Sequence, residues 1–330
     1  MIKFKKNKSR ICSNGGKEMI EDSQIEAKES PFAMRKGEIK VFDGKDGYVS
    51  MNQIINKINI GHIVDLHFEI LNLVNEFEFI TSRQLCQLLD YKGIEYKSQD
   101  KLNNKLEQLV KSKILTRYYF SSEDGKGIFK IYCLEKMGKY LLTSREQECK
   151  WQQTDNTKPI AMIKKRLAGN QTIIAYMRKV KAFESYKAKP ALTAKSLGKT
   201  FKPSGGSVKL TKASKSIEFL FEIIRREENW QKKLADKIEM YKDFYRNFVP
   251  GDSGYSMMPQ LIFVCEDEKN MVEVFKEIVT NKLEIPEIKL YFTTDLRQNE
   301  ESLAKTLTEF VLDTTTNKYK AETVNLKLLD

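Results

Sequence analysis

The sequence predicts an α+β protein built from two domains. Two patterns indicate this: three amphipathic helical segments followed by two β-rich runs within 60–145, and strand-like segments that alternate with helical ones after Lys215. The polar stretch 146–160 is the expected interdomain linker, and 161–330 holds a basic region followed by a small α/β domain. Residues 1–59 are expected to form a flexible basic arm and lead-in. With 330 residues, the chain can give each domain its own core.

The first domain is predicted from apolar residues at helical spacing and from a turn signal. Thr81 or Ser82, and later Ser98, are expected N-caps. Glu-Asp-Gly-Lys-Gly at 123–127 marks a hairpin turn, whereas 38–59 shows no clear element. The expected elements are helices over 62–77, 81–91 and 98–115, strands over 118–120 and 128–134, and a short helix over 135–142. Three helices followed by a β-hairpin is the order of a winged helix-turn-helix.

This predicted domain carries polar and basic side chains suited to DNA. Such side chains on the third helix can reach phosphates and base edges in a major groove. The expected contacts from this helix are Lys101, Asn104, Lys105, Gln108 and Lys111, and those from the hairpin are Arg117, Lys126 and Lys130. The same fold also serves protein–protein contacts, and polar helix positions are often simply solvated. The net charge of +12 favours double-stranded DNA as the partner.

The connecting region concentrates this positive charge. Between Lys158 and Lys215 there are fifteen Lys or Arg residues and one acid, Glu184. Further contacts to the DNA backbone are expected from Lys164, Lys165, Arg166, Arg178 and Lys179. Aromatic residues in the same region are interpreted as ordinary core.

Several classes of protein are disfavoured by the sequence. No window of 18 consecutive apolar residues is present, so neither a transmembrane helix nor a membrane partner is expected. The basic N-terminus lacks the apolar stretch of a signal peptide. The five cysteines are widely spaced and His62 and His67 lie five apart, which predicts no zinc site and a reduced, cytoplasmic protein.

The second domain is predicted from alternating β-rich and amphipathic segments. Strands are expected over 216–224, 259–267 and 288–296, and helices over 229–248, 268–283 and 302–313. An order of strand, helix, strand, helix and strand indicates a sheet with parallel neighbours.

A candidate active-site residue, Glu222, ends the first of these strands. Nucleases of the restriction-endonuclease-like class usually place Pro-Asp on one strand and Asp/Glu-x-Lys on the next, and their acids hold a divalent ion. Here Ser204 follows Pro203 where the Asp is expected, and Ile224 stands where the Lys is expected. A single carboxylate binds Mg²⁺ weakly, because this ion requires several oxygen ligands. No cofactor and no catalytic residue are therefore predicted, except Glu222 in the nuclease alternative given below.

The predicted order of a winged helix-turn-helix, a basic connecting region and a nuclease-like α/β domain resembles the replication-relaxation family over residues 61–312. Three short motifs carry the resemblance: Glu222-Ile223-Ile224-Arg225, then Lys237 with Tyr241, then Pro259-Gln260-Leu261-Ile262-Phe263-Val264. At two positions where the family pattern has an acid, this chain has Ile224 and Ser204 instead. The resemblance implies a DNA-binding protein of a plasmid or mobile element, acting in replication, relaxation or conjugative transfer. It also implies a nuclease-like C-terminal domain that serves as a platform for a homodimer, a relaxase or another transfer or replication protein.

Two alternative functions remain open from the sequence. The first is a Mg²⁺-dependent DNA endonuclease or nickase, in which Glu222 is the catalytic residue and Glu218 or Asp236 supplies the second acid. The second is a transcriptional repressor that acts through the winged helix alone.

Overall fold

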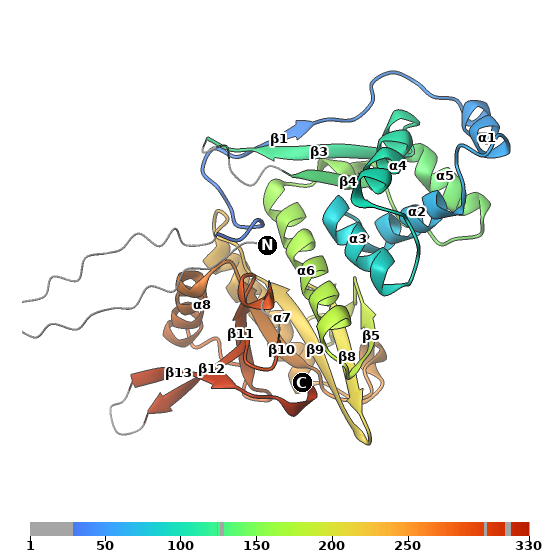
Figure 1. Cartoon of the computed structure of the whole chain (residues 1–330). Coiled ribbons are helices and arrows are strands. Elements are labelled where there is room, and N and C mark those ends of the chain that lie inside the picture. Colours follow the sequence, from blue (N-terminus) through green and yellow to red (C-terminus); the bar gives the residue numbers. More distant parts are fainter. Residues whose placement is uncertain (1–28, 124, 126–128, 300–301, 314–317, 330) are drawn as a thin grey trace, which may run out of the picture.

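A computed structural model describes residues 29–123, 125, 129–299, 302–313 and 318–329. It shows a mixed α+β structure in which the long helix α6 (Ile160–Lys179) lies between an N-terminal group of elements and the main sheet (Figure 1). Sheets of four, seven and two strands are present. None of the helices in the described part combines the length and apolar character needed to cross a membrane.

The N-terminal group contains the helices and strands expected there. Its elements are α2 (Asp65–Phe77), β2 (Ile80–Thr81), α3 (Ser82–Tyr91), α4 (Gln99–Lys111), β3 (Leu115–Ser121), β4 (Lys130–Leu134) and α5 (Lys136–Ser144). Thr81 caps α3 and Ser98 caps α4, since each side chain accepts a hydrogen bond from a backbone N–H of the first turn. Strand β4 pairs antiparallel with both β3 and β2.

The lead-in to this group is ordered, contrary to the expectation of no clear element at 38–59. Strand β1 (Ile39–Phe42) pairs antiparallel with β3, and α1 (Met51–Asn59) begins with a capping box at Ser50. The elements are short, and Ile54 is the one buried residue of α1, so periodicity alone gives little signal. Of the predicted arm, residues 1–28 lie outside the described part of the chain.

The C-terminal region is a seven-stranded sheet of order β13-β12-β11-β10-β9-β8-β5. Its strands are β5 (Phe183–Lys187), β8 (Ser207–Lys212), β9 (Lys215–Ile223), β10 (Gln260–Cys265), β11 (Leu290–Thr294), β12 (Leu307–Asp313) and β13 (Lys318–Val324). The predicted parallel neighbours are confirmed, because β10 pairs in parallel with both β9 and β11. The helices are α7 (Trp230–Arg246) and α8 (Glu268–Thr280), and a separate hairpin is formed by β6 (Leu192–Ala194) and β7 (Lys199–Phe201).

The helix predicted over 302–313 is wrong, because this segment contains strand β12. Strand β12 pairs antiparallel with β11 and β13. Its Phe310 ring stacks on Phe275 of α8, with ring centroids 3.9 Å apart. The spacing of apolar residues over 302–313 is compatible with a helix or a strand. Pairing with two neighbouring strands and the Phe310–Phe275 contact favour the strand.

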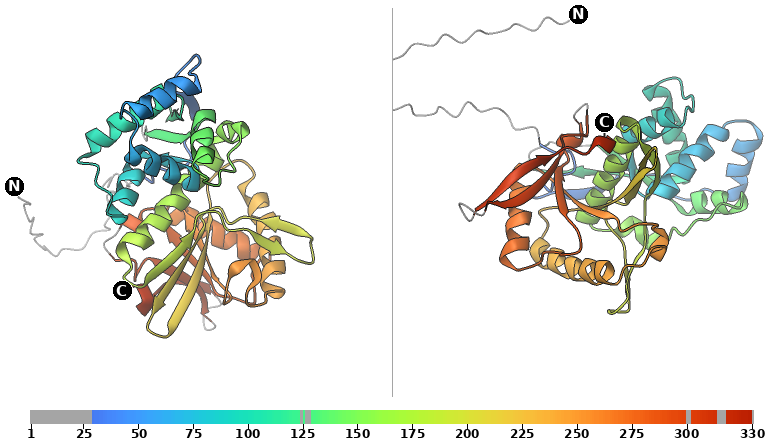
Figure 2. Two further views of the ribbon diagram at one scale, coloured as in Figure 1. Left: turned by 90° about the vertical axis from the view of Figure 1, so that its right-hand side faces the viewer. Right: turned by 90° about the horizontal axis from the view of Figure 1, so that it is seen from below.

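The two faces of the main sheet carry different helices. Along β9, Phe219 and Phe221 belong to the core shared with α6, whereas Leu220 belongs to the core shared with α7 and α8. Figure 2 shows α6 and the pair α7 and α8 on opposite sides of the sheet. Because side chains alternate along a strand, Glu222 lies on the α7 face.

The expected linker at 146–160 is packed against both regions. It contains a 3₁₀ turn, η1 (Gln153–Thr157), in which Asn156 is buried and donates a hydrogen bond of 2.9 Å to the Leu134 carbonyl. Trp151 donates from its indole N–H to Asn156 Oδ1 at 3.2 Å. One apolar core runs from α2 through α6 to β8 and β9, so the N-terminal group and the sheet are joined by direct packing on α6.

Candidate functional site

The outer face of α4 carries all five residues that the sequence predicts there. Leu102, Leu106, Leu109 and Val110 are buried against the core and fix which face points outward. Lys101, Asn104, Gln108 and Lys111 are exposed and Lys105 is half-buried. Their spacing of three and four residues places them in one stripe along the helix. We call these five residues the α4 stripe.

The predicted contact residues of the hairpin differ in their exposure to solvent. Arg117 is only 8% exposed, and its guanidinium is bound by Glu107 Oε2 at 2.6 Å and by Asp43 Oδ2 at 2.8 Å. The positive charge of Arg117 is therefore neutralised by acids within the protein. Lys130 is exposed at the start of β4, and Lys126 lies outside the described residues.

The basic residues predicted on α6 point in several directions. Lys164 is fully buried in an ion pair with Glu38, with Nζ 2.6 Å from Oε2, and burial lowers its pKa. Lys165 pairs with Glu227, while Arg166 lies 3.4 Å from Glu78 Oε2.

The two residues at the other end of α6, Arg178 and Lys179, line a separate cavity together with Lys130. Arg178 is exposed, and Lys179 donates to the Gln298 carbonyl at 2.6 Å. The structure therefore does not gather the five predicted α6 residues into one surface.

Glu222 is held by three side chains on the α7 face of the sheet. Ser204 Oγ donates to its Oε1 at 2.7 Å, Tyr241 donates from its hydroxyl to Oε2 at 2.7 Å, and Lys237 Nζ lies 3.9 Å from Oε2. Burial raises the pKa of Tyr241 well above its ordinary value, and the neighbouring Glu222 raises it further. Lys237 and Tyr241, four residues apart on α7, thus meet the glutamate that precedes them in the sequence motif.

Close packing positions Ser204 beside Glu222. The loop before β8 crosses α6 at Gly169, where an added Cβ would lie 2.5 Å from the Gly205 Cα. Gly205 N–H also donates to the Phe221 carbonyl at 2.9 Å, which ties the loop to β9. A glycine on each side therefore allows the approach that brings Pro203-Ser204 against the carboxyl group.

Arg225, the last residue of the same motif, serves the opposite face of the sheet. It is fully buried, and its Nη2 lies 3.0 and 2.8 Å from the two carboxyl oxygens of Asp295. Ser30 donates a short hydrogen bond to Asp295 as well, so the N-terminal segment is joined to this pair. The guanidinium of Arg225 therefore points away from Glu222, although the two residues are three apart on the same motif.

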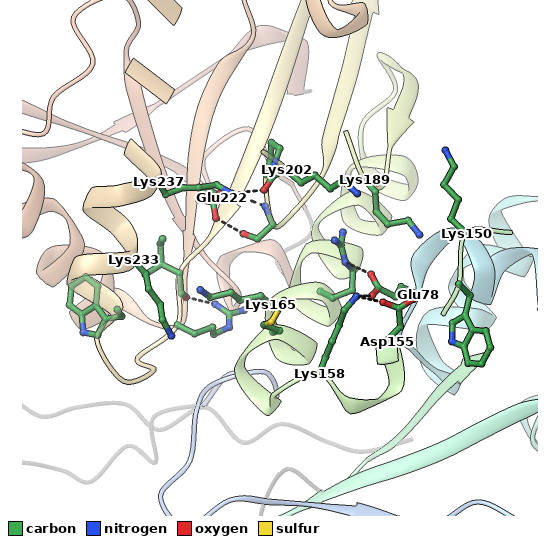
Figure 3. A pocket seen from close by; sticks show the side chains of 18 of the residues that line it. Glu78, Lys150, Asp155, Lys158, Lys165, Lys189, Lys202, Glu222, Lys233 and Lys237 are labelled. Carbon is green, nitrogen blue, oxygen red and sulfur yellow. Dashed lines mark hydrogen bonds and ion pairs between the residues drawn. The ribbon is translucent and has the colours of Figure 1, made fainter. Parts of the chain in front are cut away.

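Glu222 lies in the wall of a cavity of about 520 Å³ between α2, α6 and α7. Seven lysines and two arginines line the cavity, against three acids: Glu78, Asp155 and Glu222. Figure 3 shows Lys202 and Lys237 beside Glu222, Lys158 beside the other two acids, and Lys189 between these two groups. We call this space the Glu222 cavity.

Glu78 anchors the opposite wall of the Glu222 cavity. It ends α2 with a left-handed φ of 71°, a conformation that is uncommon for a residue other than glycine. Its carboxyl group pairs with Lys158 and with Arg166, and Lys158 also lies 3.0 Å from Asp155. These ion pairs hold the strained residue in place, and strain of this kind is concentrated at functional sites.

The side chains around Glu222 do not fit a divalent cation. Within the described residues, no group of three or more His, Cys, Asp or Glu is arranged to hold a metal ion. Glu218 is four residues earlier on β9 and opposite Lys209, and Asp236 is exposed on α7. Neither of these two acids lines the Glu222 cavity.

These features define a mixed α+β protein with an exposed polar helix and a basic cavity beside its main sheet. The chain belongs to the replication-relaxation family, whose model matches residues 71–252. Every residue that lines the Glu222 cavity falls within that range.

Similarity to solved structures and to curated proteins is weak or absent. Among solved structures, the chain has a weak similarity to the restriction endonuclease FokI, with 10% identity and a TM-score of 0.27. The alignment covers 71% of this chain and 42% of that one, so the chain spans less than half of FokI. None of the curated proteins matches this chain.

Sequence reasoning missed the gathering of basic residues around Glu222. Lys158 precedes α6, and Lys189 and Lys202 lie in two separate loops of the C-terminal region. No periodic pattern in the sequence links these three positions. The spacing of Lys233, Lys237 and Tyr241 on one face of α7 was the signal available in the sequence.

Proposed function

We propose that this protein binds double-stranded DNA of a plasmid or mobile element and acts in its replication, relaxation or conjugative transfer. The observation that carries the proposal is the α4 stripe. Family membership supports the biological setting.

The order of elements supports a DNA-binding role for α4. Helices α2, α3 and α4 followed by the β3–β4 hairpin, with β2 paired to β4, follow the order expected of a winged helix-turn-helix, which supports this assignment. In that arrangement the third helix enters the major groove, and α4 occupies this position. Lys101, Lys105 and Lys111 would contact phosphates, whereas Asn104 and Gln108 would contact base edges.

The remaining predicted contacts are assigned by their environment. Exposed Lys130 and Arg178 can reach a DNA backbone, whereas Arg117 and Lys164 are buried in ion pairs and are left out of the proposed interface. The net charge of +12 would add a non-specific attraction to DNA.

The C-terminal region is proposed to be a nuclease-like domain without metal-dependent cleavage. Glu222 stands at the end of β9, where the sequence pattern of nucleases places a ligand, but its neighbours are Ser204, Tyr241 and Lys237. We propose that this region provides a surface for a second copy of the chain or for a relaxase or related protein.

A salt series with labelled duplex DNA tests the proposal. Fluorescence anisotropy at low salt should show binding, and the logarithm of the binding constant should fall linearly with the logarithm of salt concentration, because phosphate contacts release counterions. The absence of duplex binding at low salt would overturn the proposal. Footprinting on plasmid DNA then separates the roles: protection within a replication or transfer origin supports this proposal, and protection of a promoter supports a repressor.

A further inference from the structure

We propose that the Glu222 cavity is a second nucleic-acid site, which takes an unstacked nucleotide of single-stranded DNA together with its neighbouring phosphates. The choice of DNA over RNA rests on the proposed function. The cavity itself is argued from its charge, its aromatic residues, its size and its buried carboxyl group.

The charge of the cavity selects an anion. Of the nine basic residues in its wall, Arg225 directs its guanidinium to Asp295 on the other face of the sheet, and six others are paired with acids. This leaves Lys189 and Lys202 without an ion pair among the described residues. Burial lowers the pKa of Lys189, and the charges of Arg166 and Lys202 lower it further, against a partial offset from Glu78. Positive charges that repel one another in a recess are stabilised by a bound phosphate.

Aromatic residues identify the anion as a nucleotide. The chain has two tryptophans, Trp151 and Trp230, and both line the Glu222 cavity. Both are half-buried. The indole N–H of Trp151 is bound to Asn156, which fixes the orientation of its ring. Aromatic rings combined with lysines are the usual means by which proteins bind unpaired bases and the backbone beside them.

The size of the cavity excludes duplex DNA. About 520 Å³ lies within the range of small-ligand pockets, which accommodates one nucleotide but not a double helix. A base must therefore leave its stack to enter, as it does in enzymes that act on flipped or single-stranded bases.

Glu222 provides a means of discriminating between bases. A carboxylate has about four acceptor positions, and the Ser204 hydroxyl, the Ser204 N–H and the Tyr241 hydroxyl use three of them. A free acceptor position can receive the exocyclic amino group of cytosine, a pairing known from base readout in DNA. Thymine lacks such an amino group, so oligo-dC should bind more tightly than oligo-dT.

Intrinsic fluorescence tests the proposal directly, because both tryptophans lie at the site. Titration of the full chain with a short oligo-dC should change tryptophan emission, and Trp151→Phe and Trp230→Phe should each remove part of that change. The double variant Lys189→Ala/Lys202→Ala should weaken oligo-dC binding about tenfold or more and leave duplex binding at the α4 stripe within about twofold. Lys199→Ala is the matched control, because Lys199 is exposed, lies three residues from Lys202 and does not line the cavity.

The outcomes separate this inference from the proposed function. Loss of duplex binding in Lys101→Ala/Lys105→Ala, with unchanged oligo-dC quenching, supports two distinct sites. Quenching by oligo-dC with no duplex binding in the unaltered chain overturns the proposed function and leaves the cavity assignment standing. Tighter binding of oligo-rC than of oligo-dC overturns the choice of DNA. No response of tryptophan to any single strand, or equal losses for single strand and duplex in the Lys189/Lys202 variant, overturns the cavity assignment.

Discussion

The Tyr241 hydroxyl donates a 2.7 Å hydrogen bond to Glu222 Oε2 and so joins the middle of α7 to the end of β9. Both residues are buried, at 0% and 5% exposed. The bond explains why a glutamate can stay inside the protein on this face of the sheet, since buried carboxyl groups require hydrogen-bond partners.

Tyr241→Phe is expected to destabilise the protein by about 1–3 kcal/mol, because it leaves a buried carboxyl group with one partner fewer. Chemical denaturation measures this change. Tyr245→Phe is the control: Tyr245 lies one turn further along α7, and its buried hydroxyl has no partner among the described residues. Its loss should be neutral or slightly stabilising. Equal effects of the two substitutions would contradict the assigned role of the Tyr241 hydroxyl.

The buried pair Arg225–Asp295 is expected to behave as a unit. Arg225→Met should cost about 3–5 kcal/mol, because it leaves the Asp295 carboxyl group buried without its cation. The double variant Arg225→Met/Asp295→Asn should be less destabilised than Arg225→Met alone, since the remaining side chain is then neutral. A double-mutant cycle by urea denaturation provides the measurement, and strictly additive losses would show that the two groups do not interact.

The α4 stripe is expected to determine duplex affinity and its dependence on salt. Removal of Lys101 and Lys105 together should lower the slope of log affinity against log salt by about 2, since each phosphate contact contributes about 1. Asn104→Ala should cost about 1–3 kcal/mol at the specific site and much less on unrelated DNA. Lys136→Ala, an exposed lysine on α5, is the control and should leave the slope unchanged.

His67 is expected to make the N-terminal group sensitive to acid. Burial lowers the pKa of His67, and the nearby Lys105 charge lowers it further. Its Nδ1 accepts from the Val64 N–H at 3.0 Å and its Nε2 lies 3.1 Å from Gln108 Oε1, so the neutral ring with its proton on Nε2 satisfies both contacts.

The sign of the pH effect follows from this lowered pKa. The unfolded chain takes up the proton first, so stability is fully present above about pH 6.5 and falls as the pH drops below that value, by at most about 1.4 kcal/mol per pH unit. His67→Gln should reduce this fall between pH 7.5 and 5.5, whereas His62→Gln, at an exposed position, should not. Identical pH profiles for the two variants would show that His67 is not the responsible group.

Local elements were largely predictable from the sequence. The stripe Leu102, Leu106 and Leu109 has the period of a helix, and Thr81 and Ser98 mark helix starts by their side-chain chemistry. The segment 302–313 was mispredicted as a helix because its pairing with β11 and β13 depends on residues distant in the chain.

The sequence by itself determined the helices around the α4 stripe, the parallel order of β9, β10 and β11, and the presence of Glu222 at the end of a strand. Only the tertiary structure decided that Arg117 forms an ion pair with Asp43, 74 residues away. It also decided that Lys189, Lys202 and both tryptophans line one cavity with Glu222. The reason is physical. Periodicity follows from the repeat of the local backbone, whereas ion pairs and cavities depend on which distant surfaces pack together.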